Sequence, residues 1–139
     1  MNILVIDAQG GGIGRQLIAL LKKEMPAAHI TAIGTNATAT SAMLKAGADE
    51  AATGENPVVV ACRRADVIVG PIGIVIADAL LGEVTPSMAQ AVAQSPAKRI
   101  LIPVNHCDNI VVGVGTPNRT ALVQEVVQTL KKLDEPAAF

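Results

Sequence analysis

The fold is decided by residues 3–15, which read ILVIDAQGGGIGR. Ile3–Ile6 is a short apolar run, typical of a strand buried on both faces of a parallel sheet. Glycines follow, and from Ile13 onward the apolar side chains recur mostly on one side of a helical pattern. A buried strand, a glycine-rich turn and an amphipathic helix in this order predict the opening unit of an α/β domain.

The rest of the chain repeats this alternation. Short apolar runs predict strands over Ile30–Ile33, Asp66–Gly70 and Arg99–Val104. The last predicted helix carries an apolar stripe at 3.6-residue spacing, formed by Leu122, Val123, Val126, Val127, Leu130 and Leu133. We therefore predict a single three-layer Rossmann-like domain over residues 1–139, with a mostly parallel sheet of about five strands covered on both faces.

One strand is expected to run against the others. Ile110–Val114 is apolar enough for a strand, but only Asn105–Asn109 separates it from the strand at Arg99–Val104. A parallel crossover needs a dozen or more residues, so this spacing allows only a hairpin. The sequence therefore predicts an antiparallel edge strand with Asn105–Asn109 as its turn. Ala48–Ala52 has only the pattern of a short extended piece.

Several helix starts are marked by a capping residue, with proline in the first turn in most cases. An alanine-rich helix is predicted over Asn36–Ala46, with Gly47 as its C-terminal cap, and the pairs Asn56-Pro57, Thr85-Pro86 and Thr116-Pro117 each predict another start.

The segment Ile72–Leu81 is apolar throughout apart from Asp78. Glycine and proline at its start and Gly82 at its end favour a short helix. A helix that is apolar on all faces is buried, and exposed apolar surface marks an interface. We therefore expect a homo-oligomer, most simply a two-fold dimer, with this segment at or near the contact. A buried strand or crossover helix within one subunit is the alternative.

The composition argues against nucleic acid and membranes as partners. The net charge is −1 with the basic residues scattered, and Phe139 is the only aromatic side chain, so basic stripes and stacking platforms are lacking. Apolar runs are interrupted well before the roughly 18 residues that a bilayer span requires. Half of the residues are hydrophobic, which can fill a sizeable core.

The chain is expected to be cytoplasmic. Its first residues enter a strand at once, without the basic region or cleavage site of a signal peptide. Cys62 and Cys107 are too few for a disulfide framework or a four-cysteine zinc site, and we predict no metal site.

The glycine turn is the predicted ligand site. Glycines let the backbone approach a phosphate, and the start of the following helix offers unpaired N–H groups and the positive end of the helix dipole. A Walker A loop is excluded because Arg15, and not lysine, follows the last glycine. A tight turn that packs helix on sheet is the alternative reading. The residues predicted to contact the phosphate are Gly10, Gly11, Gly12 and Gly14.

A dinucleotide is a narrower possibility. Residues 11–15, GGIGR, resemble the glycine turn of short-chain dehydrogenases, but the chain has no tyrosine to match the catalytic one of that family. No choice of glycines fits the dinucleotide spacing of i, i+2 and i+5. After the second strand, Thr35 and Asn36 stand where an acid would hold the ribose of NAD, or an arginine the phosphate of NADP. They can bind a ribose or phosphate, or simply cap the next helix.

Further contacts are expected where the other strands end, because ligands of parallel sheets bind at that edge. Gly70 and Gly73 are candidates to present backbone amides, and Asn105 is a candidate ligand contact beside His106. A plain turn is the alternative in each case.

Reactive side chains at the same edge support a second interpretation, in which the chain is a small enzyme. Its site would be completed by Asp7, Glu83 or His106, across a subunit interface if necessary. Asp7 alternatively accepts hydrogen bonds from loop amides or pairs with Arg15. A nucleophilic Cys107 with His106 is disfavoured, because sequence neighbours seldom orient as nucleophile and base.

The joint pattern of residues 5–14 (VIDAQGGGIG), 34–36 (GTN), 70–74 (GPIGI), 82–86 (GEVTP) and 102–105 (IPVN) resembles a small bacterial family of uncharacterised single-domain proteins. The likeness covers nearly the whole chain. It implies a Rossmann-like fold and carries over no catalytic residue.

The leading prediction is a protein that binds a nucleotide or other phosphorylated small molecule at the glycine turn. A nucleotide or dinucleotide is the candidate cofactor. The small enzyme is one alternative, and a scaffold subunit of a larger assembly is another. The lack of a lysine after the turn and of an evident catalytic pair favours binding over catalysis.

Overall fold

The computed structural model describes residues 1–104, 108–115 and 117–136. Within them, all the strands of the single sheet run parallel, in the order β3-β2-β1-β4-β5. The strands are β1 (Asn2–Asp7), β2 (His29–Gly34), β3 (Glu50–Thr53), β4 (Val67–Pro71) and β5 (Lys98–Ile102). The helices are α1 (Gly12–Glu24), α2 (Ala37–Lys45), α3 (Glu55–Cys62), α4 (Pro86–Gln94) and α5 (Arg119–Asp134), with a 3-10 turn η1 (Ile72–Val75) after β4. The predicted α/β, Rossmann-like architecture is confirmed.

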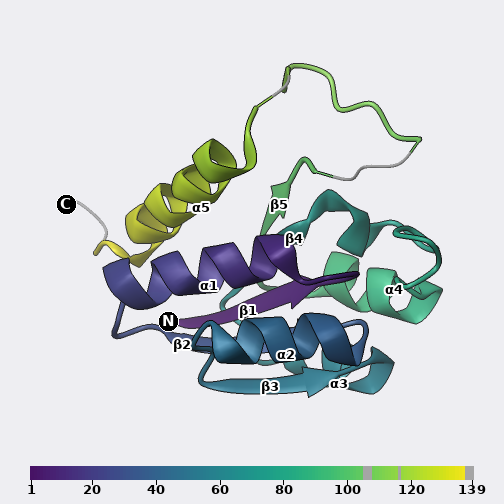
Figure 1. The fold of residues 1–139 in the computed structure, drawn as a ribbon, viewed down its shortest axis with the longest axis horizontal. Coiled ribbons are helices and arrows are strands. Elements are labelled where there is room, and N and C mark those ends of the chain that lie inside the picture. The colour runs from purple at the N-terminus through teal and green to yellow at the C-terminus, as the bar shows by residue number, and fades with distance from the viewer. Residues whose placement is uncertain (105–107, 116, 137–139) are drawn as a thin grey trace.

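Helices cover both faces of the sheet, and the alternation of side chains along β1 explains how (Figure 1). Ile3 and Val5 face a core shared with α1, α2 and α5. Leu4 and Ile6 face a second core shared with α3 and α4. Because successive side chains of a strand point to opposite faces, one wholly apolar strand serves both cores.

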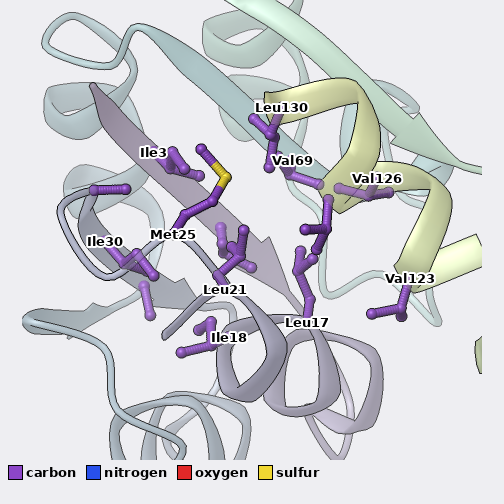
Figure 2. Packing of buried hydrophobic residues seen from close by; sticks show 14 of the residues in the cluster. Ile3, Leu17, Ile18, Leu21, Met25, Ile30, Val69, Val123, Val126 and Leu130 are labelled. Atoms are coloured by element: carbon purple, nitrogen blue, oxygen red, sulfur yellow. The ribbon is translucent and has the colours of Figure 1, made fainter. Parts of the chain in front are cut away.

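The first core also fixes α5 against α1. Figure 2 shows Leu17 and Leu21 of α1 gathered with Val126 and Leu130 of α5 beside the central strands, and all four are buried. Hydrogen bonds fix the docking at both ends, from Gln16 Nε2 to Thr120 Oγ1 at 3.2 Å and from Lys131 Nζ to Glu24 Oε1 at 2.6 Å. The predicted stripe of α5 is buried except for Leu133, which is 41% exposed. This docking places the first residue of α5 beside the first turn of α1.

The predicted antiparallel edge strand is wrong. Residues 110–114 form no strand, and Ile110 and Val112 are 89% and 93% exposed. The edge strands of the sheet are β5 and β3, of which the sequence indicated β3 only as a short extended piece (Figure 1). The predicted turn lies partly outside the described residues, since Asn105, His106 and Cys107 are not among them.

The predicted helix over Ile72–Leu81 is also wrong beyond its first turn. The 3-10 turn ends at Val75, and Asp78, Leu80 and Leu81 then adopt left-handed backbone angles, with φ of 65°, 57° and 59°. The segment is apolar because much of it packs under α4, with Ile74 and Leu80 buried. Leu81, in contrast, is 94% exposed.

The helix starts follow the predicted caps in two of four cases. The side chains of Asn36 and Thr85 accept hydrogen bonds from Ala39 N and Met88 N and cap α2 and α4. The helix α3 begins two residues earlier than predicted, at Glu55 with Gly54 as its N-cap. The helix α5 begins later, with Asn118 as its N-cap in place of Thr116, which lies outside the described residues. In the part of the chain described, no helix is both long and apolar enough to cross a membrane.

Candidate functional site

A cleft of about 300 Å³ opens at the carboxyl end of the sheet, between β1 and β4. The strand order reverses at this pair, because the chain runs outward from β1 to β3 and then returns to β4 on the other side. Such a topological switch point is where open α/β sheets bind their ligands. We call it the switch-point cleft; its lining is Asp7, Ala8, Gln9, Gly10, Gly11, Gly12, Ile13, Arg15, Pro71, Leu80 and Arg119.

The four glycines of the turn divide into two pairs. A Cβ atom on Gly11 would lie 2.8 Å from Ala39 Cα, and one on Gly14 would lie 2.6 Å from Met43 Sδ, so both positions let α1 approach α2. A Cβ on Gly10 would meet nothing within 4 Å, and one on Gly12 would meet only the Arg119 side chain, at 2.9 Å. Packing therefore explains Gly11 and Gly14, whereas Gly10 and Gly12 keep the cleft open.

Two backbone amides at the start of α1 have no partner in the parts of the chain that the structure describes. Gly11 N donates to Ala8 O at 3.0 Å, and Gly14 N donates to Asp7 Oδ2 at 2.8 Å. The N–H groups of Gly12 and Ile13 have no hydrogen-bond partner among the described residues. Free N–H groups at the positive end of a helix dipole attract an anion.

Two arginine side chains, one from near each end of the sequence, add positive charge to the cleft. Arg15 belongs to the first turn of α1, and Arg119 is the first residue of α5. Neither guanidinium forms an ion pair with a carboxylate in the described parts of the chain. Our sequence reasoning missed Arg119, because its position depends on the docking of α5 on α1. The available signal was Asn118, a good N-cap that places the following arginine in the first turn.

Asp7 forms the floor of the cleft and organises the glycine turn. Its side chain is 4% exposed and accepts hydrogen bonds from Ala8 N and Gly14 N, both at 2.8 Å. Burial raises the pKa of Asp7, while these two bonds and the charge of Arg119 oppose the rise. The predicted alternative of hydrogen bonding to loop amides is confirmed, and no hydrogen bond or ion pair joins Asp7 to Arg15.

Glu83 joins the glycine turn to the end of β2. Its Oε1 atom accepts hydrogen bonds from Gln9 N at 2.9 Å, Thr35 Oγ1 at 2.7 Å and Asn36 Nδ2 at 2.6 Å. Burial alone would raise the pKa of Glu83, but these hydrogen bonds outweigh it and lower the pKa below its ordinary range. Thr35 and Asn36 are therefore engaged by a carboxylate of the same chain and do not line the cleft.

The remaining candidates lie elsewhere. Gly70 is buried in β4, where a Cβ atom would collide with Ile6 O, and Gly73 lies under Ala79 and Leu80. Both glycines therefore have packing roles and do not line the cleft. Asn105 lies outside the described residues. Within the described ranges, no group of three or more His, Cys, Asp or Glu side chains could hold a metal ion.

A larger groove, of about 610 Å³, runs alongside α3 over β2 and β3. Its walls are mainly apolar, and its acid Glu50 is already engaged by Thr31 Oγ1 at 2.9 Å and His29 Nε2 at 3.2 Å. We place the candidate site in the smaller cleft, because unpaired amides and two arginines converge there on one space. That arrangement can hold an anion of the size of a phosphate or carboxylate.

Comparison with known proteins gives a family and a weak structural match. The family described as "Domain of unknown function (DUF3842)" matches residues 2–135. No curated protein sequence matches the chain. A solved structure that matches is the crystal structure of a dodecameric FMN-dependent Ubix-like decarboxylase from Escherichia coli O157:H7. It is 18% identical with a TM-score of 0.44, over 94% of this chain and 76% of that chain. At this identity and score, the likeness says nothing about the ligand or assembly of the present chain.

Proposed function

The chain belongs to the DUF3842 family, whose function is unknown, and we propose that it binds a small phosphorylated molecule in the switch-point cleft. One observation carries the proposal: Gly12 and Ile13, whose N–H groups have no partner in the described parts of the chain, line the same cleft as Arg15 and Arg119. Backbone amides at a helix start and planar guanidinium groups are the donors that phosphate oxygens prefer.

The roles of the carboxylates support binding more than catalysis. Both oxygens of Asp7 already accept backbone N–H bonds, and Oε1 of Glu83 accepts from three donors. A carboxylate used in this way positions the turn and the end of β2. The alternative of a small enzyme would need one of these acids to release its partners before it could move a proton.

Isothermal titration with inorganic phosphate tests the proposal. Arg119→Gln removes one charged donor and keeps part of the aliphatic stem, so we expect the binding free energy to weaken by about 1.5–3 kcal/mol, roughly 10- to 150-fold in affinity. Arg63→Gln is the matched control, since Arg63 ends α3 on the opposite face of the sheet and lies outside the cleft. Its affinity should equal that of the unmodified chain.

A second pair of variants separates charge from size at the glycine turn. Gly12→Asp places a carboxylate beside Arg119, whereas Gly12→Asn adds almost the same volume without charge. We expect Gly12→Asp to abolish phosphate binding and Gly12→Asn to weaken it less, with circular dichroism unchanged in both. Unchanged affinity in Gly12→Asp and Arg119→Gln would show that the glycine turn is only structural.

We also infer that copies of the chain associate near residues 72–81. The supporting observation is not the expected all-apolar helix, because the segment forms only a short 3-10 turn and Ile74, Ala79 and Leu80 are buried within the chain. Leu81 is the residue that supports the inference, since it is a large apolar side chain exposed beside the cleft residue Leu80.

A further inference from the structure

The carboxylate of Glu83 closes the β2 side of the cleft. Its Oε1 atom bonds to Gln9 in the glycine turn and to Thr35 and Asn36 after β2. Asn36 Nδ2 also donates to Gln9 O at 3.0 Å, so the turn and the end of β2 are joined in a closed ring of hydrogen bonds. No residue of β2 or α2 lines the cleft, which is bounded by β1, β4, α1 and α5.

A dinucleotide would need this side to be open. In open α/β sheets a dinucleotide lies across the switch point, with its pyrophosphate at the glycine turn and one ribose at the end of the second strand. The donors available there for a ribose are the Thr35 hydroxyl, the Asn36 amide and the Gln9 N–H, and all three donate to Glu83. A nucleotide would have to displace the carboxylate to reach them.

The negative charge of Glu83 also disfavours a dinucleotide. The hydrogen bonds that lower its pKa keep Glu83 ionised near neutral pH. A second phosphate placed toward β2 would therefore approach a fixed negative charge, whereas a single phosphate on the other side of the glycine turn meets Arg15 and Arg119.

The backbone before Glu83 is held in an unusual conformation. Leu80 and Leu81 both have left-handed φ values, which side chains with a Cβ rarely adopt. Such a conformation persists only where surrounding contacts fix it, and here Leu80 is buried and also lines the cleft. One segment therefore forms a wall of the cleft with Leu80 and closes its β2 side with Glu83.

From these contacts we infer that Glu83 is a specificity-determining residue, which restricts the cleft to compact phosphomonoesters and excludes dinucleotides. The inference rests on the proposed function and narrows its ligand to a class. It assigns to Glu83 a positioning role in the described fold and no part in catalysis.

Equilibrium binding to two probes tests it, with glycerol 3-phosphate as the compact phosphomonoester and NAD as the dinucleotide. The unmodified chain should bind glycerol 3-phosphate at least about tenfold more tightly than NAD. Glu83→Ala should raise the affinity for NAD by about fivefold or more and leave glycerol 3-phosphate within about twofold. Glu55→Ala is the matched control, because Glu55 also accepts a hydroxyl bond, from Thr85 at 2.6 Å, but lies outside the cleft.

The outcomes separate the two proposals. If neither probe nor inorganic phosphate binds, the proposed function fails and the inference fails with it. If NAD binds the unmodified chain at least as tightly as glycerol 3-phosphate, the proposed function stands and the inference is overturned. A loss of NAD affinity in Glu83→Ala would also overturn it, because Glu83 would then be a ribose acceptor. The comparison of probes on the unmodified chain needs no variant, so it holds even if Glu83→Ala does not fold.

Discussion

Gly10 and Gly11 are neighbours in the sequence but differ in what surrounds their missing side chains. Gly11 has a left-handed φ of 72°, and a Cβ atom there would lie 2.8 Å from the backbone of Ala39. We expect Gly11→Ala to lower the free energy of unfolding by about 2–5 kcal/mol, from left-handed strain and overpacking together. Gly10→Ala meets nothing within 4 Å and should change it by less than about 0.5 kcal/mol. Urea unfolding measures both.

The same two variants should rank in the opposite order in phosphate binding. Gly10→Ala projects a methyl group into the space that the cleft offers to a ligand, so it should weaken binding while stability is kept. Equal losses of stability in the two variants would contradict the division of the glycines into packing and cleft-lining pairs.

The buried Asp7 predicts a pH dependence of anion binding. Burial raises the pKa of Asp7, so part of its titration occurs above the ordinary range of aspartic acid. An anion in the cleft favours the neutral acid, so binding takes up a proton, and affinity falls as the pH rises through the pKa of Asp7. Sulfate is the suitable probe, because it stays fully ionised across this range. The pKa of Glu83 is shifted in the opposite direction, because its hydrogen bonds to Gln9, Thr35 and Asn36 lower it.

Titration calorimetry between acid and neutral pH checks that the affinity for sulfate falls as the pH rises. Asp7→Asn should remove the dependence attributed to Asp7. Asp66→Asn is the control, because Asp66 Oδ2 also accepts a backbone N–H, from Asn2 at 2.7 Å, but lies at the opposite end of the sheet. Affinity that rises with pH in the unmodified chain would refute the placement of the anion beside Asp7.

At the scale of elements, sequence patterns correctly predicted the strands and helices that interactions between nearby residues determine. The strands β1, β2, β4 and β5 and the helices α1, α2, α4 and α5 follow from apolar runs, helical stripes and capping residues. These signals act over a few residues, so they can be read without knowing the partners.

Two elements were predicted wrongly, because their conformation depends on residues far away in the sequence. Ile72–Leu81 looks helical in isolation, but buried contacts of Ile74 and Leu80 with α4 hold it in a 3-10 turn followed by left-handed residues. Residues 110–114 have the composition of a strand, yet no described strand pairs with them. Strand propensity is context-dependent, and a missing partner overrides it.

The contiguous part of the candidate site was predictable in detail, whereas Glu83 was expected at the same edge without its partners and Arg119 was missed. The glycine turn and Asp7 follow directly from residues 7–14, whereas Arg119 and Glu83 reach the same edge through the docking of α5 and a turn after η1. No pattern in the sequence ties Glu83 to Thr35, although the two side chains lie 2.7 Å apart at Oε1 and Oγ1.

At the scale of the whole molecule, the inferred association predicts a dimer in sedimentation equilibrium at micromolar concentration. Leu81→Asp should weaken it by about tenfold or more without unfolding the chain, because the side chain is almost fully exposed. Leu44→Asp on α2 is the control, since Leu44 is also a solvent-exposed leucine, at 51%, and lies outside residues 72–81. A monomer at this concentration would refute the association.

The docking of α5 on α1 also has a consequence for synthesis of the protein. Gln16 and Thr120, which hold the two helices together, are 104 residues apart in sequence. On the ribosome the glycine turn emerges early, yet Arg119 cannot reach it until α5 has been translated. A bound phosphate would then act as a non-covalent staple between the first and last helices, and amide exchange in α5 should slow when it is present.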